Sequence, residues 1–432
     1  MVGRSGPPAT PDRSDEPAAR YDGAALGLAE GLMFALDVCL SEVEPGQILE
    51  LTSTNPSLEH ALPAWCRGTG HELVAREAAD DGTRAVFHIR RGAAATLMFA
   101  DQPDWGLLAP DRHDGFGTTD WLIGRVGEIP AEADPHTGFS PRGSVIETGA
   151  PAFPYTETER DRVWAKSVAS LYDQATASQW NASTDIEWDA LGSLPVHLER
   201  AVCQIMTHLA ENEYAALYVP AKFIPRIHPH FTEVVMFLST QVVDEARHIE
   251  AFTKRALAGG GGLRYSTALT QSSLRSLLEQ EDFSQASFLL SVLGEGAFLE
   301  YLSFVERYAP DPVTADIVRR ARVDEARHVA FGVEHARHFL SAHPDQAETL
   351  RDAVARRASF LSDTAAGSPH IEEALVVLAA GGIGPGSLPD GVRAVRELHR
   401  TMHQRRVGRL EQLGFEPAVA QEISSLHTPN FM

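Results

Sequence analysis

One five-residue sequence occurs twice in this chain and constrains its fold more than any other feature. The pentapeptide Asp-Glu-Ala-Arg-His occupies residues 244–248 and returns, letter for letter, at residues 324–328. In each copy the glutamate and the histidine are three residues apart, so on a helix they lie on one face. The repeat therefore predicts two equivalent helices, each presenting one carboxylate and one imidazole on the same side.

That side is also the apolar side of each helix. Apolar residues at helical spacing surround Glu245 and His248 in the first copy, and Glu325 and His328 in the second. A carboxylate within a core-facing stripe costs several kcal/mol unless a positive charge compensates it. No lysine or arginine lies on the same stripe, so a bound metal ion is the simplest compensation.

Two further carboxylates lie on apolar stripes upstream of the two copies. Glu213 precedes Glu245 by 32 residues, and Glu295 precedes Glu325 by 30 residues. The nearby Glu211 points nearly opposite to Glu213 and is expected to be a solvated charge, and Glu300 is expected to point away from the stripe of Glu295. Two helix pairs, each supplying Glu and then Glu-x-x-His, predict a four-helix bundle with a di-metal carboxylate site.

The charges of the predicted site balance. Four carboxylates offset two divalent cations, and two neutral imidazoles complete the set. Carboxylate and imidazole ligands together suit iron or manganese better than zinc, which favours cysteine and histidine. The alternative is that both pentapeptides are ordinary amphipathic helix with surface pairs, which leaves four inward acids at matched spacing without an explanation.

Composition limits the classes of protein that this chain can belong to. At 432 residues with 44% hydrophobic residues, it is long enough for two or three domains. Residues 1–20 are rich in Pro, Gly, Ser and charge, and are expected to form a disordered leader rather than a signal peptide. No apolar run approaches the length of a membrane span. The three cysteines are widely spaced, which favours a cytoplasmic protein, and a net charge of −22 argues against binding nucleic acid.

Residues 21–92 have the pattern of a small α/β domain, with the predicted order αβαββ. A helix over 28–43 and a strand over 47–53 come first, followed by a second helix from 55 to 66. Strands at 72–77 and 84–90 then form a hairpin about residues 80–82.

This stretch resembles the TusA-like sulfur-carrier family. The resemblance lies in Glu-Pro-Gly-Gln-Ile-Leu-Glu-Leu at 44–51, Asn-Pro at 55–56, Leu-Pro-Ala-Trp-Cys-Arg at 62–67 and Gly-His-Glu-Leu at 70–73. Members of the family carry Cys-Pro-x-Pro at the start of the first helix, where the Cys holds a persulfide. Residues 27–32 stand there in this chain, without Cys or Pro, and Cys39 and Cys66 are expected to be buried small hydrophobes. The resemblance implies a degenerate carrier domain kept for docking or packing.

The remaining segments frame the bundle. Residues 93–156, rich in Gly, Pro and Asp, are predicted to be a linker that wraps a domain, with the possibility of a lid. Within the bundle, over 157–342, His228 and His230 flank a proline before a helix and are expected to be cap or packing residues. The last segment, 343–432, is predicted to be helical, over about 346–365, 370–380 and 389–412, and to pack around the bundle or build a homodimer interface.

The bundle resembles the ferritin-like superfamily of di-iron carboxylate proteins. Within it, the chain is most similar to the branch of bacterial monooxygenase hydroxylases, ribonucleotide reductase small subunits and arylamine N-oxygenases. The resemblance lies in Glu-Tyr-x-Ala at 213–216, Gly-Glu at 294–295 and the two Asp-Glu-x-Arg-His blocks. Ala321 stands where the N-oxygenases carry a seventh ligand, a histidine, four residues before the last Glu.

The resemblance implies roles for ten residues. The implied metal ligands are Glu213, Glu245, His248, Glu295, Glu325 and His328. Asp244 and Asp324 match aspartates that hold a ligating imidazole by its other N–H. Arg247 and Arg327 either complete that network or pair at the surface.

Three functions are compatible with this reading of the sequence. The first is a di-iron or manganese/iron oxidase or oxygenase that uses O2, a small organic substrate and an electron-donor protein. The second is a ferroxidase or iron-storage protein, which the large extra segments argue against. The third is a non-catalytic scaffold stabilised by metal. Moving from a site to a substrate rests on analogy with the family.

Overall fold

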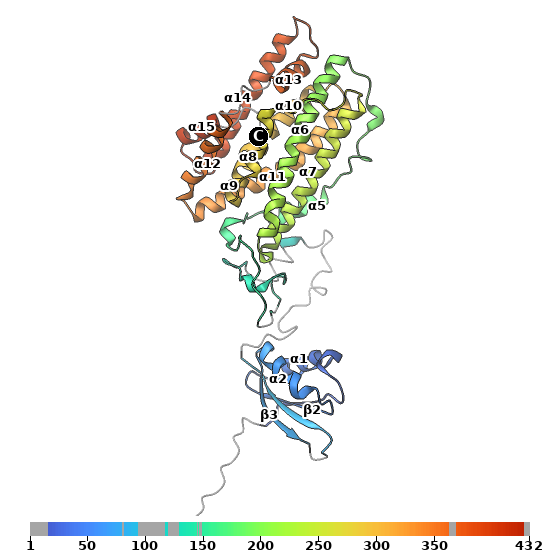
Figure 1. Ribbon diagram of the computed structural model, residues 1–432, viewed down its shortest axis with the longest axis vertical. Helices are drawn as coiled ribbons and strands as arrows, with labels where there is room; N and C mark the ends of the chain where they lie inside the picture. The colour runs from blue at the N-terminus through green and yellow to red at the C-terminus, as the bar shows by residue number, and fades with distance from the viewer. Residues whose placement is uncertain are drawn as a thin grey trace, which may run out of the picture. The chain divides into compact units, whose positions relative to one another are not determined.

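The structure is a computed structural model that describes residues 16–79, 82–93, 117–119, 129–144, 146, 149–362 and 369–426. The chain divides into two compact units, one of Met1–Gly115 with Ser144–Pro151 and one of Phe116–Gly143 with Ala152–Met432. Most of the predicted leader, the tip of the predicted hairpin and much of the predicted linker lie outside the described residues. Figure 1 shows the helical unit and the smaller mixed unit.

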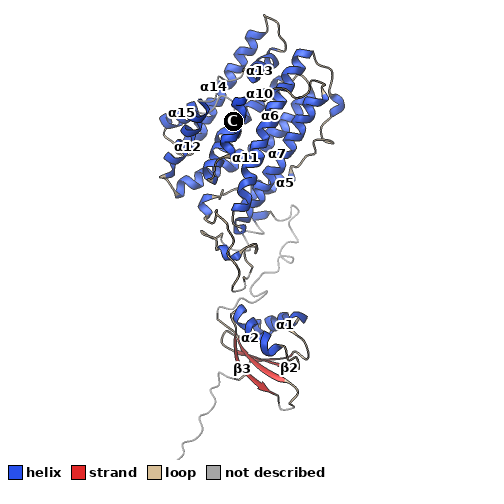
Figure 2. Ribbon diagram, in the orientation of Figure 1, coloured by secondary structure: helices blue, strands red, loops and turns tan. Residues whose placement is uncertain are grey.

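The N-terminal unit is a four-stranded sheet covered by two helices (Figure 2). Its strands are β1 (Ala19–Asp22), β2 (Ile48–Ser53), β3 (Glu72–Ala78) and β4 (Ala85–Arg90), and its helices are η2 (Leu28–Glu30), α1 (Leu32–Ser41) and α2 (Leu58–Thr69). The sheet order is β1-β2-β4-β3, with β1 parallel to β2 and the other pairs antiparallel. Inward-facing Leu49 and Leu51 of β2 and Phe87 and Ile89 of β4 pack with apolar residues of α1 and α2 in one core.

The N-terminal unit departs from the predicted order at its start. Strand β1 was not predicted from the sequence, and its first residues, Ala19 and Arg20, were expected to belong to the leader. A four-residue strand carries little local signal, and β1 is formed by pairing with β2 in the register Ala19↔Leu49. The predicted helix from residue 28 is also split, because Gly31 has φ 97° and separates η2 from α1.

The helical unit is built around a bundle of long helices (Figure 1). Its first helix pair is α6 (Val196–Phe223) with α7 (Thr232–Ala258), and its second is α10 (Gly296–Tyr308) with α11 (Pro312–Ala342). The remaining helices are α5 (Val168–Ala177), α8 (Ala268–Leu278), α9 (Phe283–Ser287), α12 (Gln346–Ser362), α13 (His370–Ala380), α14 (Leu388–Gln412) and α15 (Pro417–Leu426). Short turns of 3-10 helix are η4 (Pro135–Thr137), η5 (Arg160–Arg162), η6 (Trp188–Ala190), η7 (Ile224–Arg226) and η8 (Pro229–Phe231).

The ends of the bundle helices follow from their sequences. Asp311 caps α11 by accepting from the Thr314 backbone N–H, with Pro312 in the first turn. At the C-terminal end of α7, a Cβ at Gly259 would overlap the Glu199 carboxylate and one at Gly261 would overlap the Cys203 sulfur, while Gly260 and Gly262 have φ of 79° and 71°. Glu199 accepts from the fully buried Arg255 at 2.8 Å, which ties α6 to α7.

The third bundle helix is irregular. Between α9 and α10 the chain forms a π-helical segment, η9 (Phe288–Glu295), which the sequence analysis did not predict. π-Helical turns occur frequently at functional sites, and the last residue of this one is Glu295. The whole stretch Phe283–Tyr308 is long and apolar enough to cross a membrane, but 83% of its apolar window is buried inside the protein, as in a core helix.

Other helices agree with the sequence or correct it. The three C-terminal helices α12, α13 and α14 lie within two or three residues of their expected bounds, and α15 is the short final piece. Helix α8 was not predicted. The sequence of residues 157–179 predicts one helix at the start of the bundle, but α5 begins only at Val168, because residues 152–167 form turns and η5. The described part of the predicted linker packs on α7, where Arg142 bonds to the His230 carbonyl at 2.6 Å and to the buried Glu233 at 3.0 Å.

Candidate metal centre

The six residues expected to bind metal come from four helical segments and meet in the core of the bundle. They are Glu213 on α6, Glu245 and His248 on α7, Glu295 at the end of η9, and Glu325 and His328 on α11. Each is at most 1% exposed.

The six side chains form two overlapping groups. One contains Glu213, Glu245, His248 and Glu325, and the other contains Glu245, Glu295, Glu325 and His328. Within each group, one ligand atom from every residue lies within 4.8 Å of the others. Glu245 and Glu325 belong to both groups, so these two carboxylates are placed to bridge two ions.

Both imidazoles turn the same nitrogen toward the carboxylates. His328 Nδ1 lies 2.9 Å from Glu245 Oε1 and 3.3 Å from Glu325 Oε2. His248 Nδ1 lies 3.2 Å from Glu245 Oε2, 3.5 Å from Glu325 Oε1 and 3.9 Å from Glu213 Oε1. Nδ1 of each ring therefore faces the centre, and Nε2 faces away from it.

The carboxylates lack the hydrogen bonds that a buried polar network would have. Among the described residues, both oxygens of Glu213 and one oxygen each of Glu295 and Glu325 have no hydrogen-bond partner, and Glu245 Oε1 has only the His328 imidazole, at 2.9 Å. Leaving a buried acceptor unsatisfied costs about 1–3 kcal/mol, and more for a charged group. Unpartnered oxygens beside two imidazoles fit a pair of metal ions that accept O and N donors.

Without metal, burial and neighbouring charges shift the pKa values of these residues away from their usual ranges. Burial, and then the charges of Glu245 and Glu325, raise the pKa of Glu213 well above its usual range, and burial followed by the charge of Glu325 does the same for Glu295. Burial lowers the pKa of His328, but the Glu245 charge and hydrogen bonds to carboxylates more than offset it and raise the net value. A metal ion would therefore displace protons from the site as it binds.

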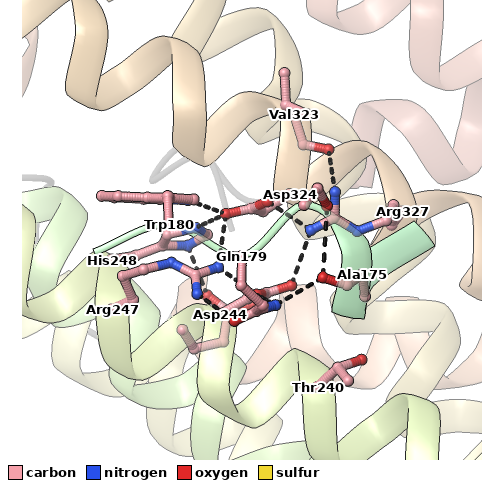
Figure 3. A network of polar contacts seen from close by, with 12 residues as sticks. Ala175, Gln179, Trp180, Thr240, Asp244, Arg247, His248, Val323, Asp324 and Arg327 are labelled. Atoms are coloured by element: carbon pink, nitrogen blue, oxygen red, sulfur yellow. Dashed lines mark hydrogen bonds and ion pairs between the residues drawn. The ribbon is translucent and has the colours of Figure 1, made fainter. Parts of the chain in front are cut away.

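The two pentapeptides orient each other's histidines, and Figure 3 shows His248 beside Asp324 of the other copy. His248 Nε2 lies 3.2 Å from Asp324 Oδ2, and His328 Nε2 lies 3.4 Å from Asp244 Oδ2. The expectation that each aspartate holds an imidazole by its other nitrogen agrees with this geometry, and the pairing crosses between the two copies. A fixed Nε2–H contact leaves Nδ1 as the nitrogen available to a metal.

The two arginines complete this network rather than pairing at the surface (Figure 3). Arg247 bonds to Asp244 and, at 3.0 Å, to Asp324 Oδ2, while Arg327 bonds to Asp324 and, at 3.1 Å, to Asp244 Oδ2. Burial alone would raise the pKa of Asp324, but hydrogen bonds from His248, Trp180 and Arg327 lower it below its usual range. Both aspartates are therefore held as anions.

Three members of the site were missed by the sequence analysis. Trp180 Nε1 donates to Asp324 Oδ2 at 2.7 Å, and Gln179 Nε2 donates to Asp244 Oδ1 at 3.2 Å. Both residues follow α5, where no periodicity marks an inward position. Gln241 Nε2 donates to Glu295 Oε1 at 3.0 Å. Its position one turn before Glu245 was a usable signal, because a polar residue there lies on the same face as the glutamate.

Other sequence expectations have mixed outcomes. Glu211 is not a solvated charge, since its side chain is 12% exposed and accepts from Gln271 at 3.0 Å and from Ser266. Glu300 does point away from the site, toward Arg405. His228 caps η8 by accepting from the His230 N–H at 3.0 Å, as expected of a cap residue.

Known proteins are similar to this chain in sequence or in structure. No protein-family model matches the chain. YrkI of Bacillus subtilis (strain 168), a protein named as a sulfur carrier, is 38% identical over 53 residues, which cover 12% of this chain and 68% of that protein. This match supports the resemblance of the N-terminal unit to sulfur carriers.

Solved structures with a similar arrangement include R2-like ligand-binding oxidases. One with an aerobically reconstituted Mn/Fe cofactor is 18% identical, with 62% of this chain and 91% of that chain covered and a TM-score of 0.38. Another, with an aerobically reconstituted metal cofactor after photoconversion, is 18% identical, with coverage of 59% and 88% and a TM-score of 0.38.

Proposed function

Since the chain belongs, through its N-terminal unit, to the sulfur-carrier protein family, while its larger unit buries four glutamates and two histidines around one centre, we propose that it is a metal-dependent oxidoreductase with a degenerate carrier domain. The proposed activity is that of a non-haem di-iron or manganese/iron oxidase or oxygenase, which uses O2 and acts on a small organic substrate. An electron-donor protein is the expected partner, because reduction of O2 by such a site requires electrons from outside.

The observation that carries this proposal is the set of unpartnered carboxylate oxygens. Three buried glutamates, Glu213, Glu295 and Glu325, with four such oxygens between them are costly in a metal-free structural network. Two divalent cations would neutralise the four charges and give each of these oxygens a partner. The donor set of oxygens and imidazole nitrogens suits iron and manganese.

When bound, the two ions would supply the redox chemistry, from reduction of O2 to oxidation of a C–H or N–H bond. The chain's residues fix the positions of the ions and the protonation states around them. Glu245 and Glu325, which belong to both groups, would help to hold both ions, while Glu213 with His248 would hold one ion and Glu295 with His328 the other. Because Asp324 and Asp244 are held as anions at Nε2 of the two rings, Nδ1 stays free of a proton when it faces a metal.

The surroundings keep bulk water away from the centre. Phe237 and Phe331 stack at 4.7 Å between ring centroids, and Phe252 packs on the His248 ring at 6.1 Å. All three phenylalanines are at most 1% exposed. A dry, low-dielectric pocket strengthens the attraction between the carboxylates and the metal ions.

The N-terminal unit is proposed to act in docking or packing rather than in sulfur transfer. Residues 27–32, where the resemblance places the persulfide cysteine, contain no cysteine. Burial raises the pKa of the Cys66 thiol to about 12, and burial followed by the Glu42 charge raises that of Cys39. Since the thiolate is the reactive form, neither residue replaces the missing nucleophile.

Metal content is the measurement that tests the proposal. The full chain, produced with iron and manganese both supplied, is expected to carry about two redox metals per chain by plasma mass spectrometry. Glu245→Ala is expected to lose both. Iron uptake far beyond two per chain would favour a ferroxidase or storage protein, and no stoichiometric redox metal after anaerobic ferrous loading would overturn the proposal.

Oxygen consumption then separates an enzyme from a scaffold. The iron-loaded chain with a chemical reductant is expected to consume O2, and a substrate is expected to raise the rate. A metal-loaded chain that does not react with O2 would instead be a metal-stabilised scaffold.

A further inference from the structure

A small, partly open cavity lies in the bundle beside one end of the candidate metal centre. Its volume is about 20 Å³, and its walls come from α6, α7, α9 with η9, and α11. Phe223, Leu238, Leu290 and Phe331 form most of its apolar surface. A water molecule requires about 10–15 Å³ measured in this way, so the cavity has room for a molecule of only a few atoms.

The polar groups of the cavity lead to Glu295. Gln241 and Ser291 both line it, and the Gln241 amide donates to Glu295 Oε1 at 3.0 Å. The other oxygen of Glu295, Oε2, has no partner among the described residues. Gln241 thus holds one oxygen of this carboxylate and leaves the other for the centre.

One hydroxyl in the cavity wall is also unused. Ser287 is 7% exposed, and its Oγ has no hydrogen-bond partner among the described residues. It is the last residue of α9 and lies about one turn before Ser291 of η9. A buried hydroxyl facing a cavity indicates a place where a small polar or polarisable molecule can be accommodated.

The Glu213 end of the centre is built differently. On α6 the cavity is lined by Val219, Pro220 and Phe223, which begin six residues beyond Glu213. Among the described residues, none that lines the cavity hydrogen-bonds to Glu213, and neither oxygen of Glu213 has a hydrogen-bond partner. Both of these oxygens are available to hold one ion, whereas Glu295 offers one.

We propose that molecules of two or three atoms reach the metal centre through this cavity and bind at its Glu295–His328 end. The inference rests on the proposed function and deepens it, because it assigns the position that takes O2. Glu295, held at Oε1 by Gln241, leaves coordination space at that end. The Glu213–His248 end, with two free carboxylate oxygens, is the closed one.

Azide, a linear molecule of three atoms, is the probe for the end that binds. It is titrated by absorbance into the oxidised iron-loaded full chain, and into two variants with the same change, Ala286→Val in the cavity wall and Ala216→Val one turn beyond Glu213. Both positions are at most 1% exposed, so the two variants are matched in burial. Ala286→Val is expected to weaken azide binding by about tenfold or more, and Ala216→Val by less than about twofold.

The reverse order of these effects, equal effects or no effect of Ala286→Val would each overturn the proposal. Circular dichroism and iron content check that each variant is folded and loaded. Ser287→Ala provides a second test that cannot fail by overpacking. It removes the hydroxyl that faces the cavity and adds no bulk, so azide binding is expected to weaken by about threefold or less. Tighter binding would contradict the role of the hydroxyl, and a loss as large as that of Ala286→Val would contradict the role of the cavity.

Xenon tests the cavity without any metal. In crystals of the metal-free full chain under xenon pressure, one xenon atom is expected among Leu238, Leu290 and Phe331, and none in Ala286→Val. If xenon stays out of the wild-type cavity, the entry route is wrong whether or not the chain binds iron. If xenon enters but iron does not bind, the proposed function fails and the cavity stands as a binding site for small molecules.

Discussion

The two halves of the bundle carry the same pentapeptide but place it in different surroundings. In the half built from α6 and α7, both acids come from regular helices, and Asp244 is supported by Gln179. In the half built from η9, α10 and α11, Glu295 ends a π-helical segment, Gln241 holds it, and Asp324 takes an additional bond from Trp180. An identical sequence therefore yields two ends of a metal centre that differ in their partners.

This difference shows where specificity in a symmetric motif originates. The residues that distinguish the two ends are neither ligands nor part of the repeat. They come from the segment after α5 and from the turn before Glu245, and they act on carboxylates through single hydrogen bonds. The following predictions test how far the two ends differ, beginning with the largest expected effect.

Loss of Glu245 or Glu325, which belong to both groups, is expected to reduce metal content more than loss of Glu213 or Glu295, which belong to one group each. Glu325→Ala removes a residue common to both groups and is expected to abolish binding of both ions, whereas Glu213→Ala is expected to retain one. Plasma mass spectrometry on the purified full chains measures the stoichiometry. Retention of two ions in Glu325→Ala would contradict a bridging role.

Replacement of Asp324 is expected to lower metal affinity more than replacement of Asp244. Asp324→Asn weakens the orientation of His248 and removes an acceptor for Trp180 and both arginines, so metal affinity is expected to fall by about 10–100-fold. Asp244→Asn is expected to cost less, because its imidazole contact is longer and it has no tryptophan donor. Competition with a metal chelator measures both affinities, and equal losses would indicate equivalent ends.

The metal-free chain should become less stable as pH rises from 5 to 8. Glu213, Glu295, His248 and His328 all have raised pKa values in the folded state. Each therefore keeps its proton to a higher pH in the folded chain than in the unfolded one, and stability is lost as pH rises toward the folded values. Asp324 and Glu245, whose pKa values are lowered, act in the opposite direction only below about pH 4.5.

Thermal melts of the metal-free and metal-loaded chains at several pH values measure this effect. The gap in Tm between them is expected to widen as pH increases, since metal replaces the protons. A constant gap over pH 5–8 would show that the six residues do not take up protons when metal is absent.

The smallest effect is expected when the hydrogen bond from Trp180 to Asp324 is removed. Trp180→Phe keeps an aromatic ring at the position where the indole lies 4.8 Å from the Arg247 guanidinium, but it removes the N–H that donates to Asp324. The loss is expected to be about 1–3 kcal/mol in the free energy of unfolding, because the acceptor is buried. Gln179→Ala is the matched change at the other aspartate and is expected to cost less, since Gln179 is exposed. Urea denaturation measures both.

The repeat and its spacing were sufficient to predict the centre's six residues and the bundle that holds them. A carboxylate and an imidazole at i, i+3 on an apolar stripe leave few other folded arrangements, so Glu245, His248, Glu325 and His328 could be found locally. Glu213 and Glu295 could be predicted because each is a carboxylate on the apolar stripe of a partner helix. The role of these residues as ligands remains part of the proposal.

The missed features depend on contacts between distant segments. Strand β1 forms by pairing with the edge of β2. In η9 the backbone hydrogen bonds join residues five apart instead of four, and an apolar run carries no sequence signal for this change. Trp180 and Glu211 likewise acquire their partners only after the chain has folded. Residue periodicity reports which face is buried, but it does not report what that face meets.

The crossed pairing of aspartates and histidines has a consequence for how the protein can be divided. Each half of the bundle carries an imidazole whose orientation is set by the opposite half. A chain cleaved in the glycine run at 259–262 would yield two pieces, neither able to aim its own histidine. The two halves are therefore interlocked, and the centre arises only from their joint folding, never from either piece in isolation.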